Sequence, residues 1–141
     1  MSDIKFRDTD HQQAFYDLCD DMLAYQSRPE LDSYHKSLAY LLTLDVVCCK
    51  HIDDLYSVED NGIIIDGLNR AWQTGTSRRT TRLAFNLWNG YSTDGEVMTD
   101  KEGNEHELTS PLYTPDALFC CEYAPYYYEA IRLRYPEYTR I

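Results

Sequence analysis

Acidic side chains at helical spacing or in adjacent pairs are the first feature of this 141-residue sequence that could support a function. Carboxylates repeated on one helix face lie several ångström apart, as phosphates do along a nucleic-acid strand, and they attract a groove rich in Lys and Arg. We therefore predict that these carboxylates bind a basic partner as phosphate surrogates. The residues concerned are Asp17, Asp20, Asp21, Asp53, Asp54, Glu59 and Asp60.

An arginine-rich segment suggests a second chemistry, the binding of a small anion. Thr76 and Ser77 precede Arg78, Arg79 and Arg82 at the start of a predicted helix. A helix N-terminus with free N–H groups and nearby guanidinium groups is suited to phosphate, although the sequence lacks a complete phosphate-binding loop motif. We expect these arginines to pair with acidic helices, either of the same chain or of a second subunit. The alternative is an anion- or nucleotide-binding site.

The cysteines and histidines do not follow a known catalytic or metal-binding pattern. Four of the five cysteines form the adjacent pairs Cys48–Cys49 and Cys120–Cys121, whereas zinc ligands are typically separated by about two to four residues. We expect reduced thiols that behave as small buried apolar side chains. The sequence also lacks the common nucleophile and metalloprotease motifs. It therefore predicts no enzyme, no metal and no cofactor.

Two helices must position most of the acidic residues. In the first, Asp10 is the predicted N-cap, and the Gln13 side chain reaches back to the Asp10 amide. The polar arc of this helix also carries Asp17, Asp20 and Asp21. The second is predicted from Asp32 or Ser33 to about Tyr56, because no Gly or Pro interrupts it. Asp45 falls within its apolar stripe, where an unpaired carboxylate is costly. We expect an Arg or Tyr from elsewhere in the fold to be its partner.

The rest of the chain predicts shorter elements. Ile63 to Ile65 is a candidate strand, and residues 68–72 form one or two helical turns. Thr76 or Ser77 caps a helix that ends before Gly90, and residues 96–108 form a polar hairpin. Further helices start at 114–116, continuing through Glu122, and at Pro125, the last exposing Glu129 and Arg132. These patterns predict a mainly α (α+β) fold with four to five helices and a small β-hairpin in one domain, residues 1–141.

The overall charge narrows the possible partners. The chain has 24 acidic and 13 basic residues, a net charge of −11, which disfavours unaided binding to nucleic acid or to an anionic membrane. It has no apolar run of about 18 residues and no secretion signal at its start. We therefore expect a cytoplasmic protein.

Five segments are distinctive as strings: YHKSLAYLLTL (34–44), HIDDL (51–55), WQTGTSR (72–78), LAFNLWNG (83–90) and FCCEYAPYY (119–127). Over about residues 30–138 they resemble a small domain family of unknown function found in Firmicutes genomes and their mobile elements. The resemblance implies a setting in which short phage-type proteins act on host machinery, including CRISPR nucleases. Together with the acidic side chains, this setting predicts an anti-CRISPR-like DNA mimic that inhibits a host nucleic-acid-binding protein such as a CRISPR nuclease. A structural protein that oligomerises through its Tyr-rich C-terminal helix is a further alternative.

Overall fold

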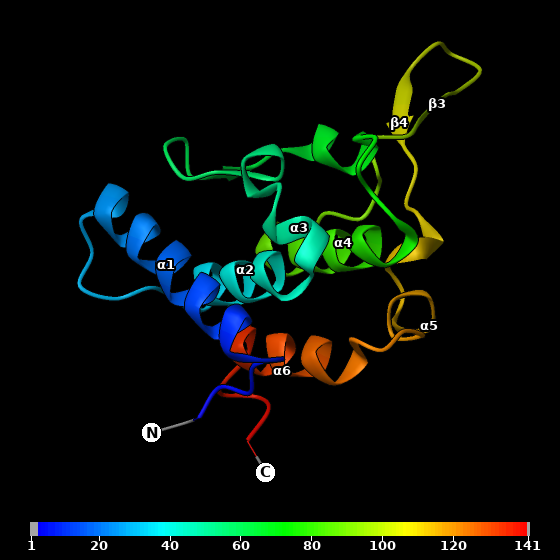
Figure 1. Cartoon of the computed structure of the whole chain (residues 1–141). Helices are drawn as coiled ribbons and strands as arrows, with labels where there is room; N and C mark the ends of the chain where they lie inside the picture. The colour runs from blue at the N-terminus through cyan, green and yellow to red at the C-terminus, as the bar shows by residue number, and fades with distance from the viewer. Residues whose placement is uncertain (1–2, 141) are drawn as a thin grey trace.

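The computed structural model describes residues 3–140, and helices dominate this part of the chain (Figure 1). The predicted mainly α fold with a small β component is confirmed. Within the described range there are six α-helices, two of which are only four residues long. Their bounds are α1 Thr9–Gln26, α2 Ser33–Leu44, α3 Val46–Cys49, α4 Gly75–Asn89, α5 Pro115–Leu118 and α6 Ala124–Arg134.

Helix α2 is the centre of the molecule. It packs against α1, α4 and α6, and every residue from Ser37 to Leu44 is buried. That stretch contains no charged side chain, so α2 can be covered on all sides, as expected for a helix that is apolar around its whole circumference. Helices α1, α4 and α6 surround it (Figure 1), and α1 and α4 each bury one face.

Helix α1 lies along one side of α2 and begins earlier than the sequence suggested. Asp8, not Asp10, is the N-cap, and its carboxylate accepts a hydrogen bond from the His11 amide at 2.9 Å. Asp10 instead lies in the first turn, where a negative charge favours the helix dipole. The predicted apolar face is confirmed, because Phe15, Leu18 and Met22 are all buried.

The long helix predicted from Ser33 to about Tyr56 is wrong in its length. The helix stops at Leu44, and Asp45 has an extended backbone that caps α3. The Asp45 carboxylate accepts from the amides of Val47 and Cys48, so its partners are backbone groups and not an Arg or Tyr. Aspartate competes with the helix in this way because its short side chain can bond to nearby amides. A 3₁₀ turn, η1 (Ile52–Asp54), follows.

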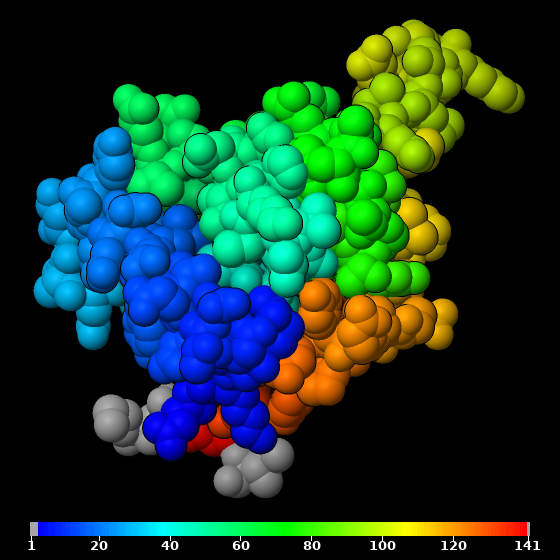
Figure 2. All heavy atoms as spheres, viewed as in Figure 1, coloured from blue at the N-terminus to red at the C-terminus, as the bar shows by residue number. Residues whose placement is uncertain are grey.

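Two short antiparallel hairpins extend from the helices. The first pairs β1 (Tyr56–Ser57) with β2 (Gly62–Ile63). Of the strand predicted from Ile63 to Ile65, only Ile63 is in β2, and Ile65 begins a 3₁₀ turn, η2 (Ile65–Asn69). The second pairs β3 (Val97–Thr99) with β4 (Glu105–Glu107), which confirms the predicted polar hairpin. Its residues are exposed, and it projects from the body of the molecule (Figures 1 and 2).

Helices α4 to α6 complete the core. Thr74 caps α4 in a capping box with Ser77, a start two or three residues earlier than predicted, and Gly90 ends the helix with a positive φ of 81°. Thr114 caps α5 as predicted, but this helix stops at Leu118, well before Glu122. Among the described residues, no helix has the length and apolarity needed to cross a bilayer.

Candidate functional site: an acidic surface and an arginine groove

The outer face of α1 carries carboxylates that no cation neutralises. Asp10, Asp17, Asp20 and Asp21 are exposed, and the helix contains no Lys or Arg. Asp17 accepts a hydrogen bond from Gln13 Nε2 at 2.9 Å. Within residues 3–140, the side chains of Asp20 and Asp21 have no hydrogen-bond or ion-pair partner. The carboxylates predicted to bind a partner are therefore available on this helix, which forms one edge of the surface in Figure 2.

The turn between β1 and β2 lies against the C-terminal end of α1. Gln26 Nε2 on α1 lies 3.4 Å from Asn61 Oδ1 on the turn, which brings the two elements together. The Tyr56 hydroxyl donates to the same oxygen at 2.7 Å, and His35 Nε2 lies 2.8 Å from it. These contacts fix Asn61 in a left-handed conformation with φ 54°. Beside it, Glu59 and Asp60 are exposed.

Asp53 and Asp54 are placed differently from the other predicted acidic residues. Both lie on η1; Asp53 is exposed, but Asp54 accepts a hydrogen bond from Trp72 Nε1 at 2.8 Å. Arg70 Nη2 is 3.8 Å from the other carboxylate oxygen of Asp54. Asp54 is therefore engaged within the fold.

We define the acidic surface as the α1 face and the β1–β2 turn, that is Asp17, Asp20, Asp21, Glu59 and Asp60.

The local charge density of α1 approaches that of one nucleic-acid strand. At a rise of about 1.5 Å per residue, Asp17 and Asp21 are separated by about 6 Å along the helix axis. Three carboxylates share that length, whereas one strand of DNA carries a phosphate about every 3.4 Å. The match covers only a short stretch, because Asp10 lies two turns earlier. The α1 face can therefore replace a few phosphates of one strand.

The arginines of α4 do not pair with the acidic helices of the same chain, contrary to expectation. Arg78 Nε donates to the Leu68 carbonyl at 3.1 Å, and Arg79 Nε donates to the Ala117 carbonyl at 3.2 Å. Arg82 forms an ion pair with Asp94, a loop residue, at 3.1 Å. Neither Arg78 nor Arg79 has a carboxylate partner within the described part of the chain.

At the start of α4, the Ser77 hydroxyl is engaged in the fold. Ser77 is buried, its hydroxyl donates to Gln73 Oε1, and its amide donates to the Thr74 hydroxyl at 3.1 Å. Thr76 is half-buried, and its carbonyl accepts from Thr80. Of the residues predicted for an anion site, Ser77 and Arg82 are therefore engaged, whereas the guanidinium groups of Arg78 and Arg79 remain available.

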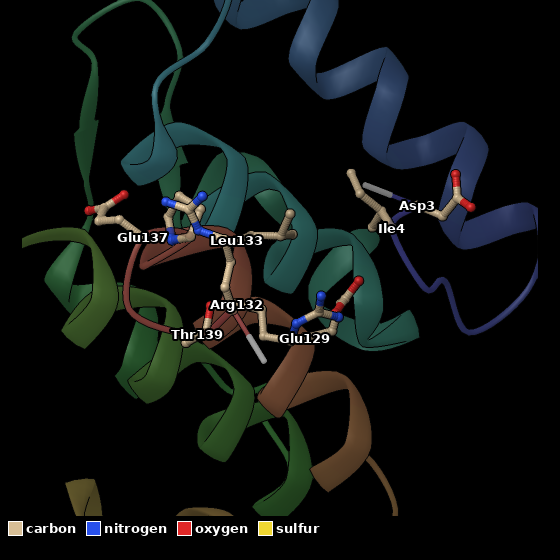
Figure 3. Close-up of a pocket in the computed structure, with 9 residues that line it drawn as sticks. Asp3, Ile4, Glu129, Arg132, Leu133, Glu137 and Thr139 are labelled. Atoms are coloured by element: carbon tan, nitrogen blue, oxygen red, sulfur yellow. The ribbon is translucent and has the colours of Figure 1, made fainter. Parts of the chain in front are cut away.

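A separate hollow of about 430 Å³ lies between the N-terminal segment and α6 (Figure 3). Asp3 and Ile4 line one side, and Glu129 and Arg132 on α6 line the other. The prediction that α6 exposes Glu129 is wrong. This side chain is buried, accepts from the Lys5 amide at 2.8 Å and pairs with Arg132 at 2.8 Å. One carboxylate oxygen therefore holds the N-terminal segment against α6, and the other pairs within the helix.

The cysteines are only partly buried as predicted. Cys19 and Cys48 are buried, and burial raises the pKa of the Cys19 thiol to about 12. Cys49 and Cys121 are half-buried, and Cys120 is exposed, contrary to expectation. Across residues 3–140, no three His, Cys, Asp or Glu side chains are grouped to hold a metal ion.

Sequence reasoning missed the role of His11. Its ring is fully buried, Nδ1 accepts from the Arg7 amide at 3.1 Å, and Nε2 lies 2.9 Å from the Tyr40 carbonyl oxygen. These partners suit a neutral ring with its proton on Nε2. The pKa of His11 is lowered to about 4, mainly because the ring is buried, and the Arg7 charge acts in the same direction. The residue therefore holds the N-terminal segment against α2.

Comparison with known proteins gives one match. The family described as "Family of unknown function (DUF6075)" matches residues 1–141. No curated protein and no solved structure matches the chain.

Proposed function

The chain belongs to a family of unknown function, DUF6075, and we propose that it is a non-enzymatic binding protein whose acidic surface docks onto a basic partner protein. Asp17, Asp20 and Asp21 are the centre of this surface, and Glu59 and Asp60 extend it. Their carboxylates occupy places that phosphates of a nucleic acid take in the partner's Lys- and Arg-lined groove.

The observation that carries the proposal is that α1 contains no Lys or Arg and that, within residues 3–140, no ion pair involves Asp17, Asp20 or Asp21. Like charges at i, i+3 and i+4 destabilise a helix by about 0.2–0.5 kcal/mol per pair. A partner that supplies positive charge relieves this repulsion, and that relief favours binding.

The proposed partner is a nucleic-acid-binding protein of a host defence system, such as a CRISPR nuclease, and the proposed action is inhibition by DNA mimicry in the cytoplasm. This finer assignment rests on the resemblance to proteins of phages and mobile elements, together with the spacing of the α1 carboxylates. The net charge of −11 further supports a protein partner over a nucleic acid.

Affinity capture tests the proposal. The tagged protein is incubated with host lysate at about 50 mM and at about 500 mM NaCl, and bound proteins are identified by mass spectrometry. We expect nucleic-acid-binding proteins to be captured at low salt and lost at high salt. The variant Asp17→Lys/Asp20→Lys/Asp21→Lys should capture none of them.

The β3–β4 hairpin offers a matched control. Glu102, Glu105 and Glu107 are exposed there, and replacing all three with Lys changes the net charge by the same amount as the α1 variant. This control should retain capture, since its charges lie outside the acidic surface. Equal loss of capture in both variants would show an effect of net charge alone. Capture that is unchanged by salt and by the α1 substitutions would refute the proposal.

A further inference from the structure

The solvent-facing side of α4 forms the floor of a hollow of about 440 Å³, which we call the arginine groove. Arg78 and Arg79 line it from α4, Leu112 lines it from the 3₁₀ turn η3 (Pro111–Tyr113), and Ala117 and Cys120 line it from α5 and the residues after it. A hollow of this size falls within the range of small-ligand sites, about 300–1,000 Å³. The groove is remote in sequence from the acidic surface and uses none of its residues.

The two guanidinium groups are held in place by bonds that leave their outer nitrogens available. Arg78 Nε is bonded to the Leu68 carbonyl and Arg79 Nε to the Ala117 carbonyl. No hydrogen bond within residues 3–140 uses the Nη atoms of either residue. Because each plane is fixed through Nε, the remaining donors are already ordered, and less side-chain freedom is lost when they bind a ligand.

The charge around the groove is unusual for this protein. The chain carries 24 acidic residues, yet residues 67–92 contain none. Asp116 lines the groove but forms no ion pair with Arg78 or Arg79 in the described structure. Asp94 is already shared between Arg82 and the Tyr113 hydroxyl. Two half-buried positive charges therefore remain without a carboxylate.

We propose that the arginine groove binds a small phosphate monoester. Two guanidinium groups match the double charge of the phosphate, and their planar donors suit its oxygens. The hollow exceeds what a phosphate group alone requires, and Leu112 and Ala117 supply an apolar wall for the organic part of the ligand. A nucleoside monophosphate combines such a charged end with a flat base whose faces can pack on apolar side chains.

Calorimetric titration tests this site, with inorganic phosphate, AMP and adenosine as probes at equal ionic strength. We expect AMP to bind more tightly than inorganic phosphate, and adenosine to show no binding. Arg79→Gln and Arg78→Gln should each weaken AMP binding at least tenfold. The control Arg70→Gln removes an arginine outside the groove and should leave the affinity unchanged. Asp116→Asn should tighten binding, because it removes the one carboxylate that lines the groove.

A second readout uses the unmodified protein and so avoids any effect of substitution on folding. Cys120 lines the groove and is exposed, whereas Cys49 is half-buried and does not line it. Saturating AMP should slow alkylation of Cys120 at least fivefold, measured by peptide mass spectrometry, and leave that of Cys49 unchanged. The proposal would be overturned if adenosine bound as tightly as AMP. It would also be overturned if Arg79→Gln left the affinity for AMP unchanged, or if AMP did not slow the alkylation of Cys120.

Because the two sites share no residue, these outcomes are independent of the capture experiment. If the α1 variant loses capture but still binds AMP, the arginine groove is a separate binding site. If Arg79→Gln loses AMP binding but retains capture, the acidic surface binds its partner without the groove.

Discussion

The carboxylate of Asp45 accepts a hydrogen bond from the Cys48 amide at 3.0 Å and a second from the Val47 amide. Asp45 is only 3% exposed and Cys48 is fully buried, so the Cys48 amide has no water as a substitute acceptor. Replacing Asp45 with Ala should lower the free energy of unfolding by about 1–3 kcal/mol. Asp45→Asn keeps an acceptor oxygen and should cost less. Urea unfolding measures both, and equal losses would show that the cap is not what Asp45 contributes.

Acid should destabilise the protein through His11. The pKa of His11 is about 4 in the folded protein against an ordinary value of 6.5, so the unfolded chain takes up this proton first. Stability is complete above about pH 6.5 and falls by about 3 kcal/mol as the pH reaches about 4. Protonation would also place an N–H on Nδ1, facing the Arg7 amide that it now accepts from.

The His11 prediction can be checked by NMR and by unfolding. The ring protons of His11 should titrate near pH 4, well below those of an exposed histidine. The difference in stability between wild type and His11→Gln should shrink as the pH falls from about 6.5 to about 4. A titration midpoint near 6.5 would contradict the neutral buried ring.

Removing the α1 charges should stabilise the fold. In Asp17→Asn/Asp20→Asn/Asp21→Asn, the repulsion between residues 17 and 20 and between residues 17 and 21 is lost, which predicts a gain of about 0.4–1 kcal/mol at low salt. The gain should vanish in about 1 M NaCl, where the charges are screened. Thermal unfolding at two salt concentrations measures this. A loss of stability would show that the carboxylates are used within the fold.

Gly67 is required by the close approach of two backbone segments. A Cβ atom at Gly67 would lie 2.4 Å from the Asp54 carbonyl oxygen and 2.7 Å from a Leu55 methyl group. Gly67→Ala should therefore cost about 1–3 kcal/mol. Gly75→Ala is the matched control, since a Cβ there meets nothing within 4 Å, and it should be neutral or slightly stabilising. Similar stability of the two variants would contradict the tight approach.

The helices with clear apolar periodicity could be predicted from the sequence, but their ends could not. Asp8 and Asp10 are both acceptable caps for α1, and only the conformation of the chain before Thr9 decides between them. For α2, the pattern continues through Asp45 because the turn at that residue keeps Cys48 buried. A local bond from the Asp45 side chain, which periodicity does not report, ends the helix.

The exposure of acidic side chains could be predicted where it follows from one helix, and it could not be predicted where it depends on distant contacts. The outward position of Asp17, Asp20 and Asp21 follows from their spacing on α1 alone. Asp54 is engaged by Trp72, 18 residues away, and Glu129 is buried by the Lys5 amide, 124 residues away. Such pairings form only when the chain folds, so composition and spacing do not predict them.

Competition with duplex DNA is the most direct test of the proposed mimicry. A partner captured by the wild-type protein is first loaded with fluorescent duplex DNA, and this protein is then added at constant salt. Displacement of the DNA by wild type but not by Asp17→Lys/Asp20→Lys/Asp21→Lys is the predicted result. A complex that holds both DNA and this protein at once would contradict the account.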